Sequence, residues 1–243
     1  CPNPGVMADY AKFGDRFTAQ KSDVFDSNSV ALSLRGVEVA FYLVHMMSGK
    51  SANFYEAEAK AARSFGEASK HAGVSQVIYM SGLGKDSDAL SEHLASRHNT
   101  GDILRELAPL VIEFRASMII GHGSISFEIV KNLVKKLPIM TLPKWSKTLT
   151  QPIGLGDALL YLTAGIDVPI TKHEIVEIGG PEKMSYQEFL SKYAKFLHKK
   201  CILIRVPVLP EWLAGWWLDL FTPKGTARVG RHMVASFRNE MVV

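Results

Sequence analysis

The stretch VEVAFYLV at residues 37–44 decides the fold of this chain, because apolar side chains occupy nearly every position of it. Such a run is typical of a strand that is buried on both faces in a parallel sheet. Over residues 53–72, apolar side chains recur every three or four positions and charged ones fill the opposite face, which predicts an amphipathic helix that ends at Gly73. QVIYM at residues 76–80 predicts the next strand. Two strands joined by a long helical crossover predict a parallel βαβ unit.

The same alternation continues along most of the chain. Further strands are predicted at residues 16–21, 110–114 and 173–178, and further helices at residues 27–34, 92–107, 127–136, 156–164 and 185–198. Strands that alternate with helical crossovers predict an α/β fold in which helices cover both faces of a parallel sheet. We expect a core of residues 1–180, within which residues 124–150 form an excursion toward a smaller, helical C-terminal lobe of residues 181–243.

Composition excludes several classes of protein. With 47% hydrophobic and 21% charged residues, the 243-residue chain has the balance of an ordinary globular protein, which excludes a disordered, collagen-like or coiled-coil chain. The two cysteines, Cys1 and Cys201, are too few for a disulfide framework or a cysteine-rich zinc site, and no metal-binding motif occurs. This cysteine usage predicts a protein of the reducing cytoplasm without a bound metal.

Charge and hydropathy bear on the partners of the protein. The net charge of +4 is scattered in pairs such as Lys135-Lys136, which argues against nucleic-acid binding. The most apolar late stretch, residues 202–221, is interrupted by charged residues and prolines, so no transmembrane segment is predicted. Its Trp-rich part, residues 210–221, has three tryptophans at helical spacing. They form either the core of the lobe or a surface that contacts a membrane or a protein.

Seven motifs carry a resemblance to a known family. They are, in chain order, DVFD (23–26), VAFYLVH (39–45), VIYMSGLG (77–84), HLASR (93–97), FRASMIIGHG (114–123), QPIGLGD (151–157) and EIGGPEKMSYQEF (177–189). Together they resemble the extended short-chain dehydrogenase/reductases and look closest to the atypical NAD(P)-binding, NmrA-like group. The resemblance spans nearly the whole chain. It implies a Rossmann-type fold, NAD or NADP as the cofactor, and an unknown small molecule as the substrate.

The resemblance also implies which residues contact the cofactor. In the family, an acidic residue and a small apolar one after the third strand contact the adenine, and the ends of the next strands line the central part of the cofactor. These positions map, in chain order, onto Asp23 and Val24, then Leu43, Val44 and His45, and then Ser81 and Gly82. They fall at the carboxyl ends of strands, where open α/β sheets bind ligands. The residues themselves leave an alternative at two positions. Asp23 also suits a plain turn. His45 also suits a strand end where the imidazole is hydrogen-bonded within the protein.

One feature of the family has no counterpart in the chain. The family's Gly-rich turn after its first strand lets backbone N–H groups approach the pyrophosphate at a helix N-terminus. None of the Gly-x-Gly pairs at 82/84, 121/123 and 154/156 has a third glycine three residues on. We therefore expect the chain to begin after the family's second strand, without the residue that selects NAD or NADP. SFRNEMVV at residues 236–243 resembles a family strand cut short, so we expect a fragment.

The catalytic pair of the family is altered. The family uses a Tyr and a Lys four residues later on one helix face, and here His93 and Arg97 occupy these positions. A guanidinium stays protonated and cannot relay a proton. The assisting Ser of the family aligns with Ser81 or with Gly82. The first interpretation is an oxidoreductase or epimerase-type enzyme in which His93 replaces the Tyr. The alternative is a non-catalytic dinucleotide sensor or assembly protein, in which His93 packs and Arg97 binds a cofactor oxygen.

Overall fold

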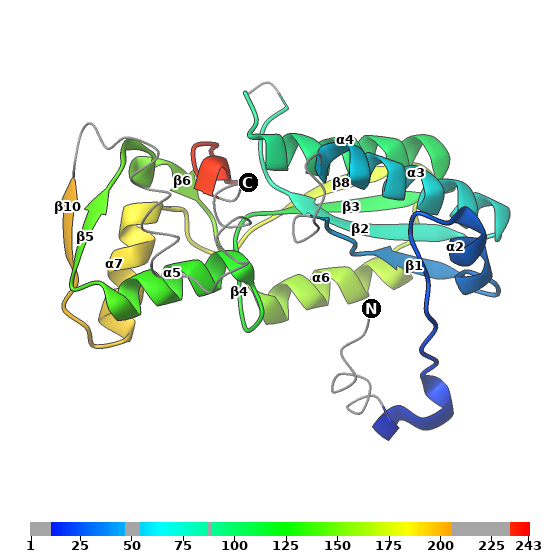
Figure 1. Cartoon of the computed structure of the whole chain (residues 1–243), viewed down its shortest axis with the longest axis horizontal. Coiled ribbons are helices and arrows are strands. Elements are labelled where there is room, and N and C mark those ends of the chain that lie inside the picture. Colours follow the sequence, from blue (N-terminus) through cyan, green and yellow to red (C-terminus); the bar gives the residue numbers. More distant parts are fainter. Residues whose placement is uncertain (1–10, 47–53, 87–88, 206–233) are drawn as a thin grey trace.

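The computed structural model describes residues 11–46, 54–86, 89–205 and 234–243 (Figure 1). Its centre is a sheet of four parallel strands in the order β1-β2-β3-β8. The strands are β1 (Val39–Tyr42), β2 (Gln76–Gly82), β3 (Val111–Ala116) and β8 (Glu174–Ile178). β2 and β3 are buried at nearly every position, as expected of strands that are covered on both faces. This sheet confirms the predicted α/β fold.

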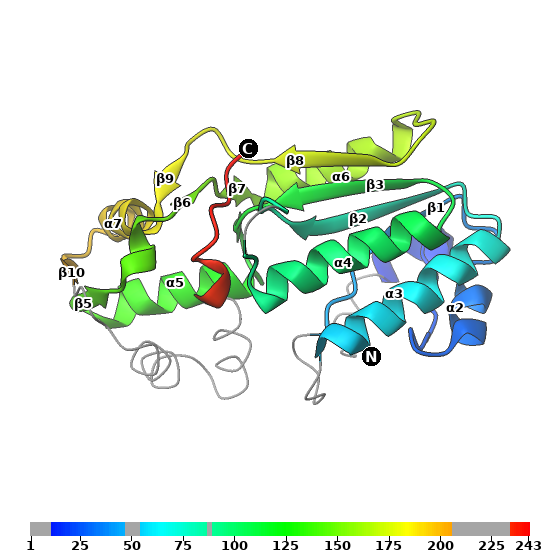
Figure 2. The same cartoon turned by 90° about the horizontal axis from the view of Figure 1, so that it is seen from above.

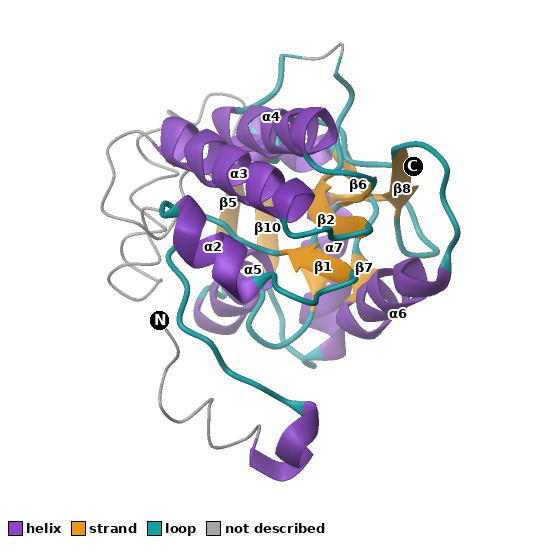
Figure 3. Cartoon of the chain, turned by 90° about the vertical axis from the view of Figure 1, so that its right-hand side faces the viewer, coloured by secondary structure: helices purple, strands orange, loops and turns teal. Residues whose placement is uncertain are grey.

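Helices cover the two faces of the sheet (Figures 2 and 3). α3 (Phe54–His71) and α4 (Glu92–Leu107) lie on one face with α2 (Ser27–Ser33) beside them, and α6 (Leu155–Asp167) lies on the other. Successive side chains of β2 point to opposite faces. Tyr79 therefore packs with Tyr42 and Phe65 beneath α3, whereas Ile78 packs with Leu162 of α6. The sheet thus separates two apolar clusters.

Local sequence signals set the ends of the helices. The Asp26 carboxylate accepts a hydrogen bond from the backbone N–H of Asn28 at the start of α2, at 3.0 Å. Gly73 follows α3 with a φ of +75°, a left-handed conformation that glycine adopts without strain. The observed bounds of α2, α3 and α4 agree with the predicted helices to within one residue at each end.

A second group of elements lies beyond the carboxyl ends of the strands (Figure 1). It contains α5 (Ile125–Lys136), β5 (Ile139–Leu142), η2 (Lys144–Lys147), α7 (Tyr186–Phe196) and β10 (Ile202–Arg205). β5 pairs in parallel with β10, and α5 packs against α7. Two short pairs join this group to the sheet region, β4 (Ile119–Ile120) with β7 (Ile153–Gly154) and β6 (Leu149–Thr150) with β9 (Met184–Ser185). The division of the chain into domains at residue 180 stays a prediction.

One predicted strand is wrong. The chain forms a 3-10 helix, η1 (Ala11–Arg16), and residues 17–21 have no regular structure and are exposed. A strand needs a neighbour that satisfies its backbone N–H and C=O groups. Within the described ranges no strand pairs with this segment. The predicted Trp-rich segment at residues 210–221 lies outside the described residues.

A buried network of charges ties α4 to the sheet. The fully buried carboxylate of Glu113, in β3, accepts hydrogen bonds from Arg105 of α4 and, at 2.9 Å, from Nε of Arg115. Asp86 bridges Arg115 and His98, at distances of 3.2 Å and 2.5 Å. Buried charges are costly unless they are paired, so these partners fix how α4 lies on β3.

Gly101→Ala tests this close packing. A Cβ at Gly101, in α4, would lie 2.7 Å from the carboxyl carbon of Glu113, which its two arginines hold in place. Overpacking costs about 1–3 kcal/mol, and Ala recovers only about 1 kcal/mol over Gly in a helix. We therefore expect a lower free energy of unfolding in urea. Gly156→Ala in α6 is the matched control, because nothing lies within 4 Å of its Cβ position. Equal stabilities of the two variants would contradict this account.

Candidate functional site

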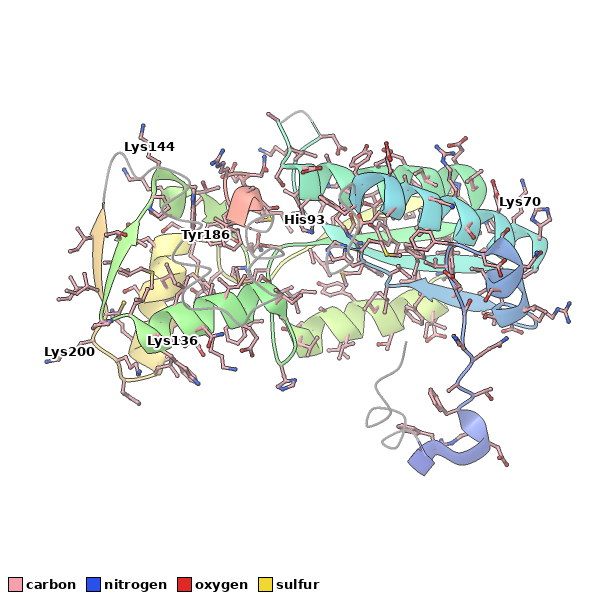
Figure 4. All side chains as sticks on the ribbon, in the orientation of Figure 1. Lys70, His93, Lys136, Lys144, Tyr186 and Lys200 are labelled. Carbon is pink, nitrogen blue, oxygen red and sulfur yellow. The ribbon has the colours of Figure 1, made fainter. Side chains whose placement is uncertain are left out.

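Chemistry-bearing side chains gather at the carboxyl ends of β1 and β2. His45 follows β1, Ser81 lies near the end of β2, and His93 and Arg97 lie one turn apart on α4. Glu58 reaches the same place from α3. Figure 4 shows His93 at the end of α4 that faces the second group of elements. The structure thus brings together four residues that the sequence singled out and adds a glutamate that sequence reasoning missed.

Glu58 is a buried carboxylate with several partners. Its side chain is 3% exposed and contacts Nδ1 of His45. It accepts hydrogen bonds from Ser96 Oγ at 2.5 Å and from the backbone N–H of Met46 at 3.1 Å, and Nη1 of Arg97 lies 4.0 Å away. Burial by itself raises the pKa of this carboxyl, but the hydrogen bond and charge of His45, the hydrogen bond of Ser96 and the charge of Arg97 together lower the pKa to about 2. Glu58 is therefore ionised at neutral pH.

His45 is anchored on one side and accessible on the other. Its Nδ1 faces Glu58, and its side chain is 34% exposed. The His45 ring lies 5.2 Å from the His93 ring, measured between centroids. The two histidines therefore lie side by side at the edge of the sheet, and one of them is oriented by a buried carboxylate.

Arg97 joins the ends of two strands. Its guanidinium donates hydrogen bonds to the backbone carbonyls of Val44, at 3.2 Å, and of Met80. The same group stacks over the Tyr79 ring, 4.7 Å from its centroid. The Tyr79 hydroxyl in turn donates to the Arg97 carbonyl at 2.9 Å. These contacts hold the guanidinium between β1 and β2, and its prediction as a cofactor ligand stays a prediction.

The C-terminal segment, residues 234–243, packs against the start of α4 beside His93. Ser236 Oγ lies 3.1 Å from Nδ1 of His93 and 2.8 Å from Ser91 Oγ. Asn239 accepts a hydrogen bond from the Ser91 backbone N–H at 3.0 Å and donates to the Ala89 carbonyl at 3.1 Å. Sequence reasoning missed Ser236 and Asn239, because no local pattern signals a contact between segments so far apart in the chain.

Ser81 and Gly82 have different environments at the end of β2. The Ser81 hydroxyl is buried and forms no hydrogen bond within the part of the chain that the structure describes. It lies close to the Tyr79 hydroxyl, which is already committed to the Arg97 carbonyl. At Gly82, a Cβ would lie 2.6 Å from Leu94 Cδ2, so the absence of a side chain lets α4 approach the strand. Ser81 is therefore a buried hydroxyl beside Tyr79, and Gly82 allows close packing of α4.

The structure does not bring the predicted adenine contacts into this cluster. Asp23 is exposed in a turn ahead of α2, where its carboxylate accepts from the backbone N–H of Phe25 at 3.0 Å. Val24 and Val44 pack partly buried against the apolar cluster beneath α3. Leu43 is 58% exposed at the end of β1. The predicted roles of Asp23, Val24 and Leu43 toward a cofactor stay predictions.

Within residues 11–46, 54–86, 89–205 and 234–243, no group of three or more His, Cys, Asp or Glu side chains is placed to hold a metal ion. No helix in the same ranges is both long enough and apolar enough to cross a membrane.

Several solved structures share the fold at low sequence identity. Triphenylmethane reductase from Citrobacter sp., complexed with NADP(H), has a TM-score of 0.74 and 11% identity over 99% of this chain and 80% of that one. dTDP-glucose 4,6-dehydratase from Streptomyces venezuelae, with NAD bound, has a TM-score of 0.65 and 16% identity over 96% and 84%. dTDP-4-dehydrorhamnose reductase from Bacillus anthracis, in complex with NADP, has a TM-score of 0.62 and 15% identity over 87% of this chain and 86% of that one.

These likenesses confirm the Rossmann-type fold that the sequence motifs predicted. The matches cover between 87% and 99% of this chain, so they extend beyond the sheet into the second group of elements. No protein-family profile and no curated protein sequence matches the chain.

Glu58→Gln should reduce stability in a pH-dependent way. Because folding lowers the pKa of Glu58 from its ordinary value of 4.5 to about 2, the ionised carboxylate stabilises the folded state above about pH 4.5, and this contribution is lost as the pH falls toward 2. We expect the variant to be about 1–3 kcal/mol less stable at pH 7 and the deficit to shrink at pH 3 in urea unfolding. Glu67→Gln, exposed on the same helix, is the control. A deficit that does not change with pH would refute this electrostatic role.

Proposed function

We propose that the chain binds NAD or NADP at the carboxyl edge of its sheet and is an oxidoreductase or epimerase-type enzyme of the atypical short-chain dehydrogenase/reductase group. The observation that carries this proposal is the cluster of His45, Ser81, His93 and Arg97 at the edge where open α/β sheets bind ligands. Solved proteins of the same fold hold NAD or NADP, which supports the choice of cofactor.

The side chains at this edge suit the central part of a dinucleotide. The Ser81 hydroxyl is buried beside the Tyr79 hydroxyl, and the His45 side chain is 34% exposed. Both are groups that hydrogen-bond to ribose hydroxyls or to an amide. We assign Leu43, Val44 and Gly82 to the same contact through their backbone and exposed apolar atoms. A Gly-rich turn that would hold the pyrophosphate is not among the described residues.

The other predicted residues take different parts in this proposal. Asp23 and Val24 are assigned to the adenine, as the resemblance implies. Arg97 holds the ends of β1 and β2 through its two carbonyl contacts, so we assign it to shaping the site. When bound, the cofactor supplies or accepts a hydride, and the chain must supply a proton donor or base beside the substrate. The substrate class is a small carbonyl, alcohol or nucleotide-sugar-like compound.

Calorimetric titration with NADPH and NADH tests the binding site. We expect saturable binding of at least one of them with a Kd between about 1 μM and 1 mM. Leu43→Glu, at an exposed position on the proposed contact, should weaken it at least tenfold, because it brings a negative charge toward an anionic ligand. Leu160→Glu is the matched control, since Leu160 is 68% exposed on α6 and is not among the residues assigned to the dinucleotide. The proposal fails if neither dinucleotide binds the unmodified chain.

His93→Ala should leave turnover within about tenfold of the wild-type value. Loss of a general acid costs about 10²–10⁴-fold, and we assign His93 to packing against the C-terminal segment through Ser236. The measurement is steady-state reduction of a panel of aldehydes, ketones and sugar nucleotides. A thousandfold loss at unchanged cofactor affinity would instead make His93 the acid. Binding of a dinucleotide without turnover of any of these compounds by the wild type would favour the non-catalytic sensor.

A further inference from the structure

The position of Glu58 needs an explanation beyond the stability of α3. It stands on the apolar face of the helix, four residues after Phe54 and three before Ala61, both of which are buried. A charge at such a position costs stability unless partners compensate for it. The nearest titratable partner of Glu58 is His45. The guanidinium of Arg97 lies 4.0 Å from the carboxylate and bonds directly to two backbone carbonyls.

The contact with Glu58 fixes where His45 carries its hydrogen. An ionised carboxylate only accepts hydrogen bonds, so Nδ1 of His45 must donate. The neutral ring is then the Nδ1–H tautomer, and the proton that it gains or loses is the one on Nε2. No hydrogen bond from another described residue engages Nε2, and the side chain is one-third exposed. The exchangeable proton of His45 is therefore directed away from Glu58.

We propose that His45, oriented by the buried carboxylate of Glu58, is the proton donor of the reaction. This inference rests on the proposed function. In the reduction of a carbonyl, bound NAD(P)H would supply the hydride for the new C–H bond, and the electron pair of the C=O π bond would move to oxygen. Nε2 of the His45 imidazolium gives its proton to that oxygen, which yields the alcohol, the oxidised cofactor and the neutral Nδ1–H imidazole. Water then reprotonates Nε2. Oxidation of an alcohol uses the same steps in reverse.

The surroundings of His45 support this role. Charged and titratable groups face it from two helices, Glu58 from α3 and Arg97 and His93 from α4. Arg97 also bonds to the carbonyl of Val44, the residue before His45, and so fixes the backbone that carries the imidazole. A base oriented by a carboxylate through its second nitrogen is a recurring arrangement for proton transfer. Glu58 is accordingly a positioning residue.

The contact of His93 with Ser236 differs in kind from that of His45 with Glu58. Nδ1 of His93 lies 3.1 Å from the hydroxyl of Ser236, and a hydroxyl either donates or accepts. The Ser236 contact by itself therefore does not select one tautomer, whereas the Glu58 carboxylate selects one for His45.

NMR spectroscopy of the ¹⁵N-labelled full chain without cofactor tests the orientation directly. Long-range ¹H–¹⁵N spectra distinguish the two tautomers, and His45→Gln identifies the signals of His45 by their loss. We expect neutral His45 to be the Nδ1–H tautomer in the wild type and in Glu58→Gln, whose amide oxygen still accepts. Glu58→Met, which offers no acceptor, should shift it toward Nε2–H, the form that free imidazole side chains favour. An Nε2–H tautomer in the wild type overturns the proposal.

Kinetics with the same chain test the chemical role. His45→Gln should lower kcat, measured at saturating NADPH and substrate, by about 10²–10⁴-fold. Glu58→Gln should lower kcat with little change in KM, because it keeps the geometry and removes the charge that stabilises the imidazolium. His71→Gln and Glu67→Gln are the matched controls, since both residues lie on the exposed face of α3, and His71 follows Lys70 at the far end of the molecule (Figure 4).

The outcomes separate this inference from the proposed function. A wild type that neither binds a dinucleotide nor turns over a substrate overturns both. An active wild type with His45→Gln within tenfold of it overturns the role of His45 and leaves the proposed function standing. Loss of kcat in His45→Gln, together with the Nδ1–H tautomer, supports the proposal.

Discussion

Two buried carboxylates, Glu58 and Glu113, hold α4 against its neighbours, and the geometry of the site depends on them. A buried charge must find partners, and α4 supplies these as Ser96 and Arg97 for Glu58 and as Arg105 for Glu113. The two carboxylates come from α3 and from β3, so the helix is fixed at two points along its length. A displacement of α4 by one turn, about 5.4 Å, would separate both carboxylates from their partners on the helix.

The fixed helix explains how residues far apart in the chain meet at one edge. With α4 in place, Arg97 reaches the carbonyls at the ends of β1 and β2, and His93 meets the C-terminal segment through Ser236. The parallel sheet contributes the rest, because its strands all end on the side that faces the second group of elements. The site therefore follows from a parallel sheet that the hydrophobic pattern predicts and from ion pairs that it does not.

Much of the fold could be predicted because its signals are local. The apolar run at residues 37–44, the amphipathic period of α3 and the capping box that begins with Ser185 each depend on a few neighbouring residues. The predicted strand at residues 16–21 is wrong because its sequence suits a strand but no neighbour pairs with it among the described residues. The pairing of β5 with β10 is equally non-local, and no pattern in either segment indicates it.

Spacing could predict where some residues of the site lie, but not what they contact. The four-residue spacing in HLASR predicts that His93 and Arg97 share one face of a helix, and both lie on α4, but a motif does not indicate that the guanidinium bonds to backbone carbonyls. The sequence contains one signal for Glu58, because it is a glutamate on the apolar face of an amphipathic helix, four residues after Phe54. The sequence contains no such signal for Ser236, because its contacts with Ser91 and His93 form only in the folded chain.

Amide chemical-shift mapping with NADPH reports where a dinucleotide lies on the protein without requiring a substrate. We expect the largest shifts at the carboxyl ends of β1 and β2, at His45, Ser81 and Gly82, and small ones at Leu133 and Leu190 in the apolar cluster of α5 and α7. Shifts concentrated at Leu133 and Leu190, with the ends of β1 and β2 unchanged, would contradict this expectation.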